Sequence, residues 1–177
     1  NHELLMAWLT LPFGQDFFVN AGNVLVAGML VIAVHKILKA MKMSDFLSWL
    51  GAAFVMAMPI FLRQIGTEQV DLFMALMLSL SWYFAFRTFQ RRDGLLLIPM
   101  LLAMAIMLGT KYLALLYAAP LIVAFFLLGK YWKTSTKLWW FWCFLILGSL
   151  GSIWYWRNMV LTGNPFFPAE ITIGNMV

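Results

Sequence analysis

The chain is poor in cysteine and in charge. Its 177 residues contain one cysteine, and Asp, Glu, Lys and Arg together make up 11% of them. A soluble domain has roughly a quarter charged residues, so the composition excludes an ordinary soluble protein. The single thiol, Cys143, excludes a disulfide framework or a thiolate metal site within one chain. It lies in an apolar run, where we expect a small packing residue.

Familiar catalytic signatures are also absent. The sequence has no Ser-His-Asp set, no Walker loop and no zinc motif, and no repeat with a period of 20 to 50 residues. His2 and Glu3 are adjacent, but no second histidine or acid stands at metal-ligand spacing from them. Any chemistry must therefore come from residues that a membrane fold brings together.

Long apolar segments dominate instead. Hydrophobic residues make up 64% of the chain and the mean hydropathy is +0.88. The apolar runs cover residues 17–38, 46–62, 70–86, 95–108, 113–128 and 138–156. About 20 residues cross a hydrocarbon core as a helix, so the fourth run is short, and the fourth and fifth could instead form one re-entrant hairpin. We predict an all-α polytopic transmembrane bundle of about six spans, in a single domain over residues 1–177.

Two kinds of local signal refine these spans. Ser44 or Asp45 is suited to cap the N-terminus of the second span. Pro59, Pro99 and Pro120 fall inside spans, where each is expected to kink a helix because it lacks the N–H that the helix needs.

The basic residues are sorted between alternate gaps. Nine of the twelve lie in three of them: Lys36, Lys39, Lys42, Arg87, Arg91, Arg92, Lys130, Lys133 and Lys137. This is the positive-inside pattern, which places these gaps on the cytoplasmic side beside anionic lipid and the N-terminal end on the other side. It favours membrane lipids over nucleic acid as partners. Short loops suggest a bacterial inner membrane.

The opposite face therefore holds the candidate chemistry. It carries Arg63, Lys111 and Arg157 together with five of the seven acids. Glu68 and Asp71 are three residues apart, so on a helical turn their carboxylates share a face. Two carboxylates can hold a divalent cation such as Mg²⁺ or Mn²⁺; the alternative is that they only favour the positive end of a helix.

Arg63, Lys111 and Arg157 have the charge needed to bind a phosphate group. A lysine near hydrocarbon either snorkels to the interface or finds an anion, and an arginine can pair with phosphate bidentately. Gly109 and Thr110 would let backbone N–H groups approach an anion beside Lys111. Interface anchoring is the alternative role for Lys111 and Arg157. Gly163, Asn164 and Pro165 form a strong turn signal after the sixth span.

Several segments of the chain resemble those of a known protein family. The segment WYWRNMVLTGNPFFP, residues 154–168, resembles the W..RN....TGNP.(Y/F)P segment of polytopic GT-C glycosyltransferases, the relatives of protein O-mannosyltransferases and lipid A aminoarabinose transferases. AIMLGTKYLALLYAAPL at residues 105–121, the Gln69–Leu72 start of a span and NHELLMAWLTLPFGQD at residues 1–16 are similar to that group too. The likeness covers most of the chain in order.

The resemblance implies a function. Such enzymes transfer a sugar from a polyprenyl-phosphate carrier to an acceptor on the non-cytoplasmic face. It implies an acidic site at Asp71, with Glu68 near it, and carrier-phosphate binding by Lys111, Arg157 and Arg63. The group's main catalytic acid would lie upstream of Asn1, so the catalytic residues are unknown and the chain is expected to be a fragment. The alternatives are a transporter or flippase of a lipid-linked anion, or a non-catalytic membrane scaffold.

Overall fold

The protein is helical throughout the part that the structure describes. A computed structural model describes residues 6–8, 10–12, 17–65, 70–131, 141–143 and 145–167, without the side chains of residues 17–20. The α-helices are α2 (Phe17–Ala40), α3 (Asp45–Ala57), α4 (Pro59–Ile65), α5 (Asp71–Arg91), α6 (Leu97–Leu108), α7 (Ala114–Leu128) and α9 (Ile153–Thr162). Short 3₁₀ turns cover Gly94–Leu96 and Gly129–Tyr131, and a π-helical turn covers Leu147–Gly151. No strand occurs among these residues, so the predicted all-α class is confirmed.

Three helices are long and apolar enough to cross a membrane. They run over Ala21–Ala40, Asp71–Arg91 and Ala114–Tyr131. The α3–α4 pair makes a fourth if the two count as one span, although they are bent by 69°. The remaining apolar helices, Gly94–Leu108 and Phe141–Gly151, are shorter than a bilayer requires. The structure thus supports a membrane protein, and the count of six spans stays a prediction.

The bend between α3 and α4 has a simple cause in proline chemistry. Met58 ends α3 with an extended backbone, at φ −63° and ψ 127°, because the ring of a following proline disfavours the helical conformation. Pro59 then starts α4. Pro99 instead lies in the first turn of α6, where a missing N–H costs little, and Pro120 lies inside α7. Of the three expected breaks, the one at Pro59 ends a helix.

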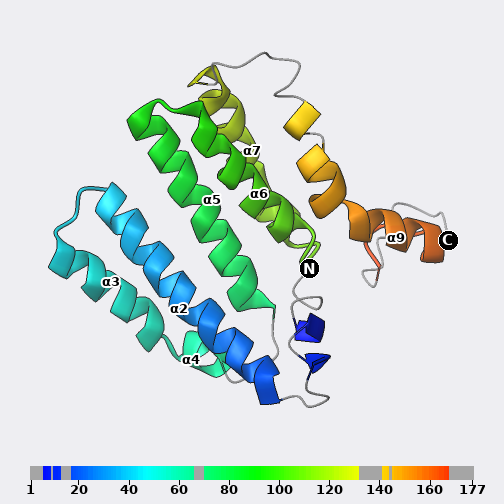
Figure 1. The fold of residues 1–177 in the computed structure, drawn as a ribbon, viewed down its shortest axis with the longest axis horizontal. Coiled ribbons are helices and arrows are strands. Elements are labelled where there is room, and N and C mark those ends of the chain that lie inside the picture. The colour runs from blue at the N-terminus through cyan, green and yellow to red at the C-terminus, as the bar shows by residue number, and fades with distance from the viewer. Residues whose placement is uncertain are drawn as a thin grey trace, which may run out of the picture.

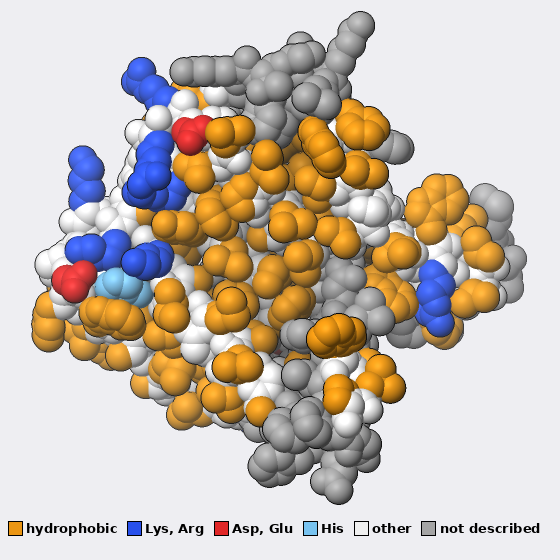
Figure 2. All heavy atoms as spheres, in the orientation of Figure 1, with side chains coloured by type: hydrophobic (Ala, Val, Ile, Leu, Met, Phe, Trp, Pro, Cys, Tyr) orange, Lys and Arg blue, Asp and Glu red, His pale blue; other side chains and the backbone are white. Residues whose placement is uncertain are grey.

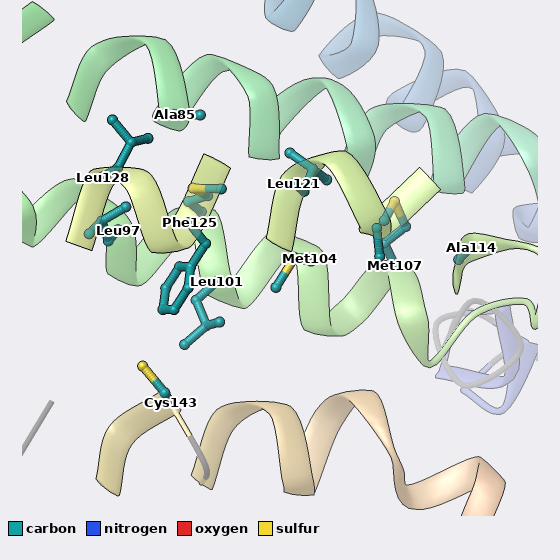
Figure 3. Close-up of a cluster of buried hydrophobic side chains, with 12 residues drawn as sticks. Ala85, Leu97, Leu101, Met104, Met107, Ala114, Leu121, Phe125, Leu128 and Cys143 are labelled. Atoms are coloured by element: carbon teal, nitrogen blue, oxygen red, sulfur yellow. The ribbon is translucent and has the colours of Figure 1, made fainter. Parts of the chain in front are cut away.

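Helix α6 packs against both α5 and α7 in the larger core (Figure 1). The buried side chains of this core come from α5, α6 and α7, with Cys143 approaching from the segment before α9 (Figure 3). Cys143 is 3% exposed, so its prediction as a packing residue is confirmed. A second core joins α2, α4 and α5. Because α5 takes part in both cores, it fixes the two halves of the bundle against each other.

Helix α5 also sets the distance between the two ends of the bundle. It runs over 21 residues from Asp71 to Arg91, which at 1.5 Å per residue is about 30 Å. Its partner α2 runs parallel to it, so that the two helices end on the same side and Gln90 donates a hydrogen bond to the carbonyl of Ala40. At the same end, the Ser44 hydroxyl accepts from the N–H of Leu47 at 3.3 Å, which confirms the predicted cap of α3. Asp71 lies at the opposite end.

Candidate functional site

An ion pair marks the Asp71 end of the bundle. The Lys111 ammonium lies 2.7 Å from a carboxylate oxygen of Asp71, and each side chain is about one third exposed. Asp71 is the first residue of α5, where a negative charge is favoured by the helix dipole. Lys111 lies in the tight turn between α6 and α7. The pair thus fixes the start of one helix to a turn 40 residues further along the chain.

The turn before Lys111 does not offer its backbone to an anion. The N–H of Gly109 donates to the carbonyl of Ala105 at 3.0 Å, and the N–H of Thr110 donates to the carbonyl of Met107 at 3.0 Å. The Thr110 hydroxyl is also used, since it donates to the carbonyl of Ile106. The expectation that Gly109 and Thr110 present N–H groups to a phosphate was therefore wrong. These groups satisfy the last carbonyls of α6.

Helix α9 ends in a turn that folds back on the helix itself. Gly163 terminates α9 at φ 71°, a left-handed conformation, and its N–H donates to the carbonyl of Met159. The Asn158 amide then donates to the carbonyl of Phe167 at 3.0 Å and to that of Pro165 at 3.5 Å. Asn164 accepts from the N–H of Phe166 at 2.9 Å. The RN and TGNP halves of the segment are therefore one hydrogen-bonded unit.

This unit is attached to the bundle through Tyr155. Its hydroxyl donates to the carbonyl of Leu108, at the end of α6, at 2.9 Å. Its ring meets Phe166 edge-on, with centroids 5.8 Å apart. Elsewhere α9 projects away from the helices (Figure 1). The Tyr155 contacts thus bring the turn at residues 163–167 to the same end of the bundle as Lys111.

A pocket of about 620 Å³ lies between these elements. Its charged lining residues are Lys111, from the α6–α7 turn, and Arg157, from α9. Much of the remaining wall is aromatic or apolar and includes Val70, Leu108, Tyr112, Trp154, Tyr155, Pro165, Phe166 and Phe167. The volume falls within the range of small-molecule sites. Two cations with apolar walls favour an anionic ligand that also carries apolar groups.

Arg157 is held from one side by an aromatic ring. Its guanidinium lies over Trp154, 5.4 Å from the ring centroid, where the negative face of the ring attracts a cation. The head of Arg157 is otherwise exposed. Arg157 can therefore turn toward a ligand while it keeps the contact with Trp154.

The comparisons with known proteins found no relatives. No family model matches the chain, and no curated protein or solved structure is significantly similar to it. The case for a function thus depends on the geometry of this pocket.

The structure brings together some of the residues that the sequence singled out. Lys111 and Arg157 line one pocket, Asp71 pairs with Lys111, and Pro165 lies in the wall. Gly163 and Asn164 shape the turn beside it. Arg63 is exposed near the end of α4 and does not line the pocket. Glu68 lies outside the described residues.

Two residues of the site were not among the predicted ones. Tyr155 anchors α9 to α6, and Asn158 holds the turn at residues 163–167. Both lie within the WYWRN segment, so the sequence motif contained them. Their roles require the fold, because each contacts a residue that spacing alone does not place nearby.

The described residues show no ready-made group of metal ligands. They contain no group of three His, Cys, Asp or Glu side chains that could hold a metal ion. The Asp71 carboxylate already contacts the Lys111 ammonium, and a metal there would have to displace that cation. The predicted Mg²⁺ or Mn²⁺ site at Glu68 and Asp71 stays a prediction.

Proposed function

We propose that this chain is the carrier-binding part of a membrane glycosyltransferase of the GT-C type. It would act on a sugar linked to a polyprenyl phosphate at the non-cytoplasmic face, within a bundle of about six spans. The observation that supports this best is the shared pocket of Lys111 and Arg157, two cations 46 positions apart in the sequence, against aromatic walls. A lipid phosphate presents the two matching features, an anionic head and an apolar tail.

The charges suit the departure of a lipid phosphate. When a sugar leaves its carrier, negative charge grows on the phosphate oxygen that bound the anomeric carbon. Lys111 and Arg157 would stabilise that charge by charge-assisted hydrogen bonds. Asp71 would act through Lys111, by holding its ammonium at the pocket. The carboxylate base that activates the acceptor hydroxyl is not assigned to any described residue.

The position of the pocket in the bundle agrees with this role. Asp71 and Lys111 lie about 30 Å along α5 from the end where most of the basic residues gather. By the positive-inside pattern, that basic end faces the cytoplasm, so the pocket would face the other side. Carrier lipids of this kind present their phosphate at the membrane surface, where the partly exposed pair of Asp71 and Lys111 would meet it.

A binding measurement on the reconstituted chain tests the proposal. The protein in phosphatidylcholine nanodiscs would be titrated with a polyprenyl phosphate and, as the matched probe, with the free polyprenol. We expect the phosphate to bind at least tenfold more tightly, because only it can pair with the two cations. Lys111→Gln and Arg157→Gln should each remove most of this preference. Arg63→Gln, at an exposed cation outside the pocket, is the control.

A transfer assay distinguishes the enzyme from the alternatives. It follows a labelled sugar from its polyprenyl-phosphate carrier, in membranes that contain the whole glycosyltransferase of which this chain would be the carrier-binding part. Loss of transfer in both pocket variants, with Arg63→Gln active, supports the enzyme. Equal binding of phosphate and polyprenol would overturn the pocket assignment. Tight phosphate binding without transfer would instead favour a transporter of a lipid-linked anion.

A further inference from the structure

A dense group of cations lies at the end of the bundle opposite to the pocket. Six basic side chains of the described part of the chain belong to two neighbouring helix ends, and we call them the basic platform. They are Lys36, Lys39 and Lys42, at the end of α2, and Arg87, Arg91 and Arg92, at the end of α5. Figure 2 shows the basic side chains gathered at this end of the molecule.

The two halves of the platform form one surface. Helices α2 and α5 pack against each other along their length. The Gln90 amide of α5 donates to the carbonyl of Ala40, the last residue of α2. Arg87 in turn donates to the side-chain oxygen of Gln90 at 3.4 Å. The relative position of the two groups of cations is therefore fixed by the fold.

The nearby acids leave most of this charge uncompensated. Asp45 pairs with Lys39 at 3.1 Å. Asp93 accepts the N–H of Leu95 at 3.0 Å and so caps the turn at Gly94–Leu96. Within the described residues, six platform cations thus face two carboxylates, one of which is used as a cap. Such an excess of positive charge attracts anions strongly at low ionic strength.

Backbone conformation gives a second, independent observation. Lys42 and Arg92 are the non-glycine residues with positive φ in the described chain, at 65° and 52°. Each follows the end of a helix, at a position where glycine or asparagine usually stands because a Cβ is crowded there. Glycine would relieve this crowding at both positions. The backbone at these two positions therefore does not itself require lysine or arginine.

The surroundings of the platform indicate the chemistry of the partner. Large apolar side chains next to it are exposed: Met41 57%, Phe46 74%, Phe89 63% and Leu95 63%. A soluble polyanion would gain nothing from these groups. An anionic phospholipid offers a phosphate to the cations and acyl chains to the apolar rim.

We propose that the basic platform binds the headgroups of anionic phospholipids, and that Lys42 and Arg92 are held in the left-handed conformation so that they point charge at this layer. The proposal is independent of the pocket and of any sugar transfer. It concerns the opposite end of the bundle and the membrane leaflet that faces it.

The test uses a substitution for which charge and strain act in opposite directions. The full chain and its Lys42→Gly/Arg92→Gly double variant would be reconstituted in vesicles of phosphatidylcholine, with and without phosphatidylglycerol. Glycine suits a positive φ, so in phosphatidylcholine alone the variant should unfold at the same temperature as the native chain or at a higher one. Retention of phosphatidylglycerol, measured by native mass spectrometry, should fall about tenfold, since each cation near an anionic surface contributes to lipid attraction.

Two matched variants make the result specific. Lys42→Arg/Arg92→Lys keeps both charges and should retain phosphatidylglycerol as the native chain does. Arg63→Gln removes a charge from an exposed residue outside the platform and should change retention by less than about twofold. Added salt should weaken retention by the native chain.

Three outcomes would overturn the proposal. The first is that the double glycine variant retains phosphatidylglycerol as well as the native chain. The second is that Arg63→Gln lowers retention as much as the double variant, which would indicate a general effect of net charge. The third is that soluble inorganic phosphate raises the unfolding temperature in phosphatidylcholine as much as phosphatidylglycerol does, which would identify a free anion as the ligand.

Discussion

The two ends of the bundle use lysine and arginine in different ways. At the basic platform, six cations occupy helix ends, and few of them have an acidic partner. At the pocket, Lys111 lies against Asp71, and Arg157 lies over Trp154 beside apolar walls. Exposed charges act through their number and are screened by salt. A charge near apolar walls acts through its position, because the local dielectric is lower.

This difference predicts that a single charge matters far more at the pocket than at the platform. Lys111→Asp should lower the affinity for a polyprenyl phosphate by about a hundredfold, or about 3 kcal/mol, because it removes a cation and sets two carboxylates side by side. Lys36→Asp should change the same affinity by less than about twofold. Titration in nanodiscs measures both. Equal losses in the two variants would mean that net charge, and not position, governs binding.

Swapping the residues at positions 71 and 111 distinguishes the structural role of the Asp71–Lys111 ion pair from its role in binding. Asp71→Lys combined with Lys111→Asp keeps an ion pair between α5 and the α6–α7 turn, so the unfolding temperature should return close to that of the native chain. Affinity for the phosphate should stay at least tenfold weaker, because a carboxylate now lies in the pocket lining. If the exchanged protein regains full affinity, then Lys111 serves only to join the two elements.

Side-chain amides link chain segments at both ends, and removing them should have different consequences. Asn158→Ala removes the hydrogen bonds to Pro165 and Phe167 and should cost about 1–2 kcal/mol in stability. It should also lower phosphate affinity, because the wall that contains Phe166 is no longer held. Gln90→Ala should cost about 1 kcal/mol, since it releases α5 from Ala40, and leave affinity unchanged. Hydrogen exchange at residues 163–167 is the direct measurement.

Hydrogen exchange can show whether Asn158 holds the turn at residues 163–167. Faster exchange at residues 163–167 is expected in Asn158→Ala and not in Gln90→Ala. If the turn is equally protected in both variants, Asn158 does not hold it. Reduced affinity in Asn158→Ala would then need another cause.

Residues with positive φ occur at both ends of the bundle. Replacing the glycine at one end should destabilise the protein, and introducing a glycine at the other end should stabilise it. Gly163 lies at φ 71° with open space around its Cα, so Gly163→Ala introduces strain and no clash; it should destabilise by about 1 kcal/mol. Lys42→Gly at φ 65° should stabilise by about 0.5–1 kcal/mol. Chemical unfolding in one detergent measures both. Gly28→Ala, at a helical site with equally open space, controls for the added methyl group. Effects of the same sign at both positions would show that conformation is not the deciding term.

Much of the helical framework could be predicted from the sequence. Long apolar runs at residues 17–38, 70–86 and 113–128 predicted α2, α5 and α7 to within a few residues, because hydrophobic length is the strongest local signal. The cap at Ser44, the break at Pro59 and the burial of Cys143 depended on local chemistry and were also correct. Within the described residues, the fourth and sixth runs form short apolar helices, and neither length nor composition decides whether they cross a membrane.

The site could be predicted only in part. The charge pattern pointed to Asp71, Lys111 and Arg157, but not to the contact between Asp71 and Lys111, which joins residues 40 positions apart. The suggestion about Gly109 and Thr110 failed because the end of a helix uses nearby N–H groups for its own carbonyls. Asn158 was overlooked because its partners, Pro165 and Phe167, come close only after the chain reverses at Gly163.

A buried polar atom lies beside the basic platform. His35 is 6% exposed and stacks on Trp49, with centroids 4.1 Å apart and planes at 21°. Its Nδ1 has no hydrogen-bond partner among the residues that the structure describes. His35→Phe keeps an aromatic ring on Trp49 and removes the unpaired nitrogen, so it should stabilise by up to about 1 kcal/mol. His35→Ala should destabilise by about 2 kcal/mol or more, because it loses the stack and leaves a cavity.

Thermal unfolding of the two His35 variants, in phosphatidylcholine nanodiscs, decides what the imidazole contributes. A gain for His35→Phe with a loss for His35→Ala means that the ring acts through packing alone. The platform then binds anions only through its lysines and arginines. If His35→Phe is as destabilised as His35→Ala, the nitrogen atoms must hold a partner in the membrane. A lipid headgroup at the platform would be the first candidate, because Lys36 and Lys39 lie within one turn of His35 on α2.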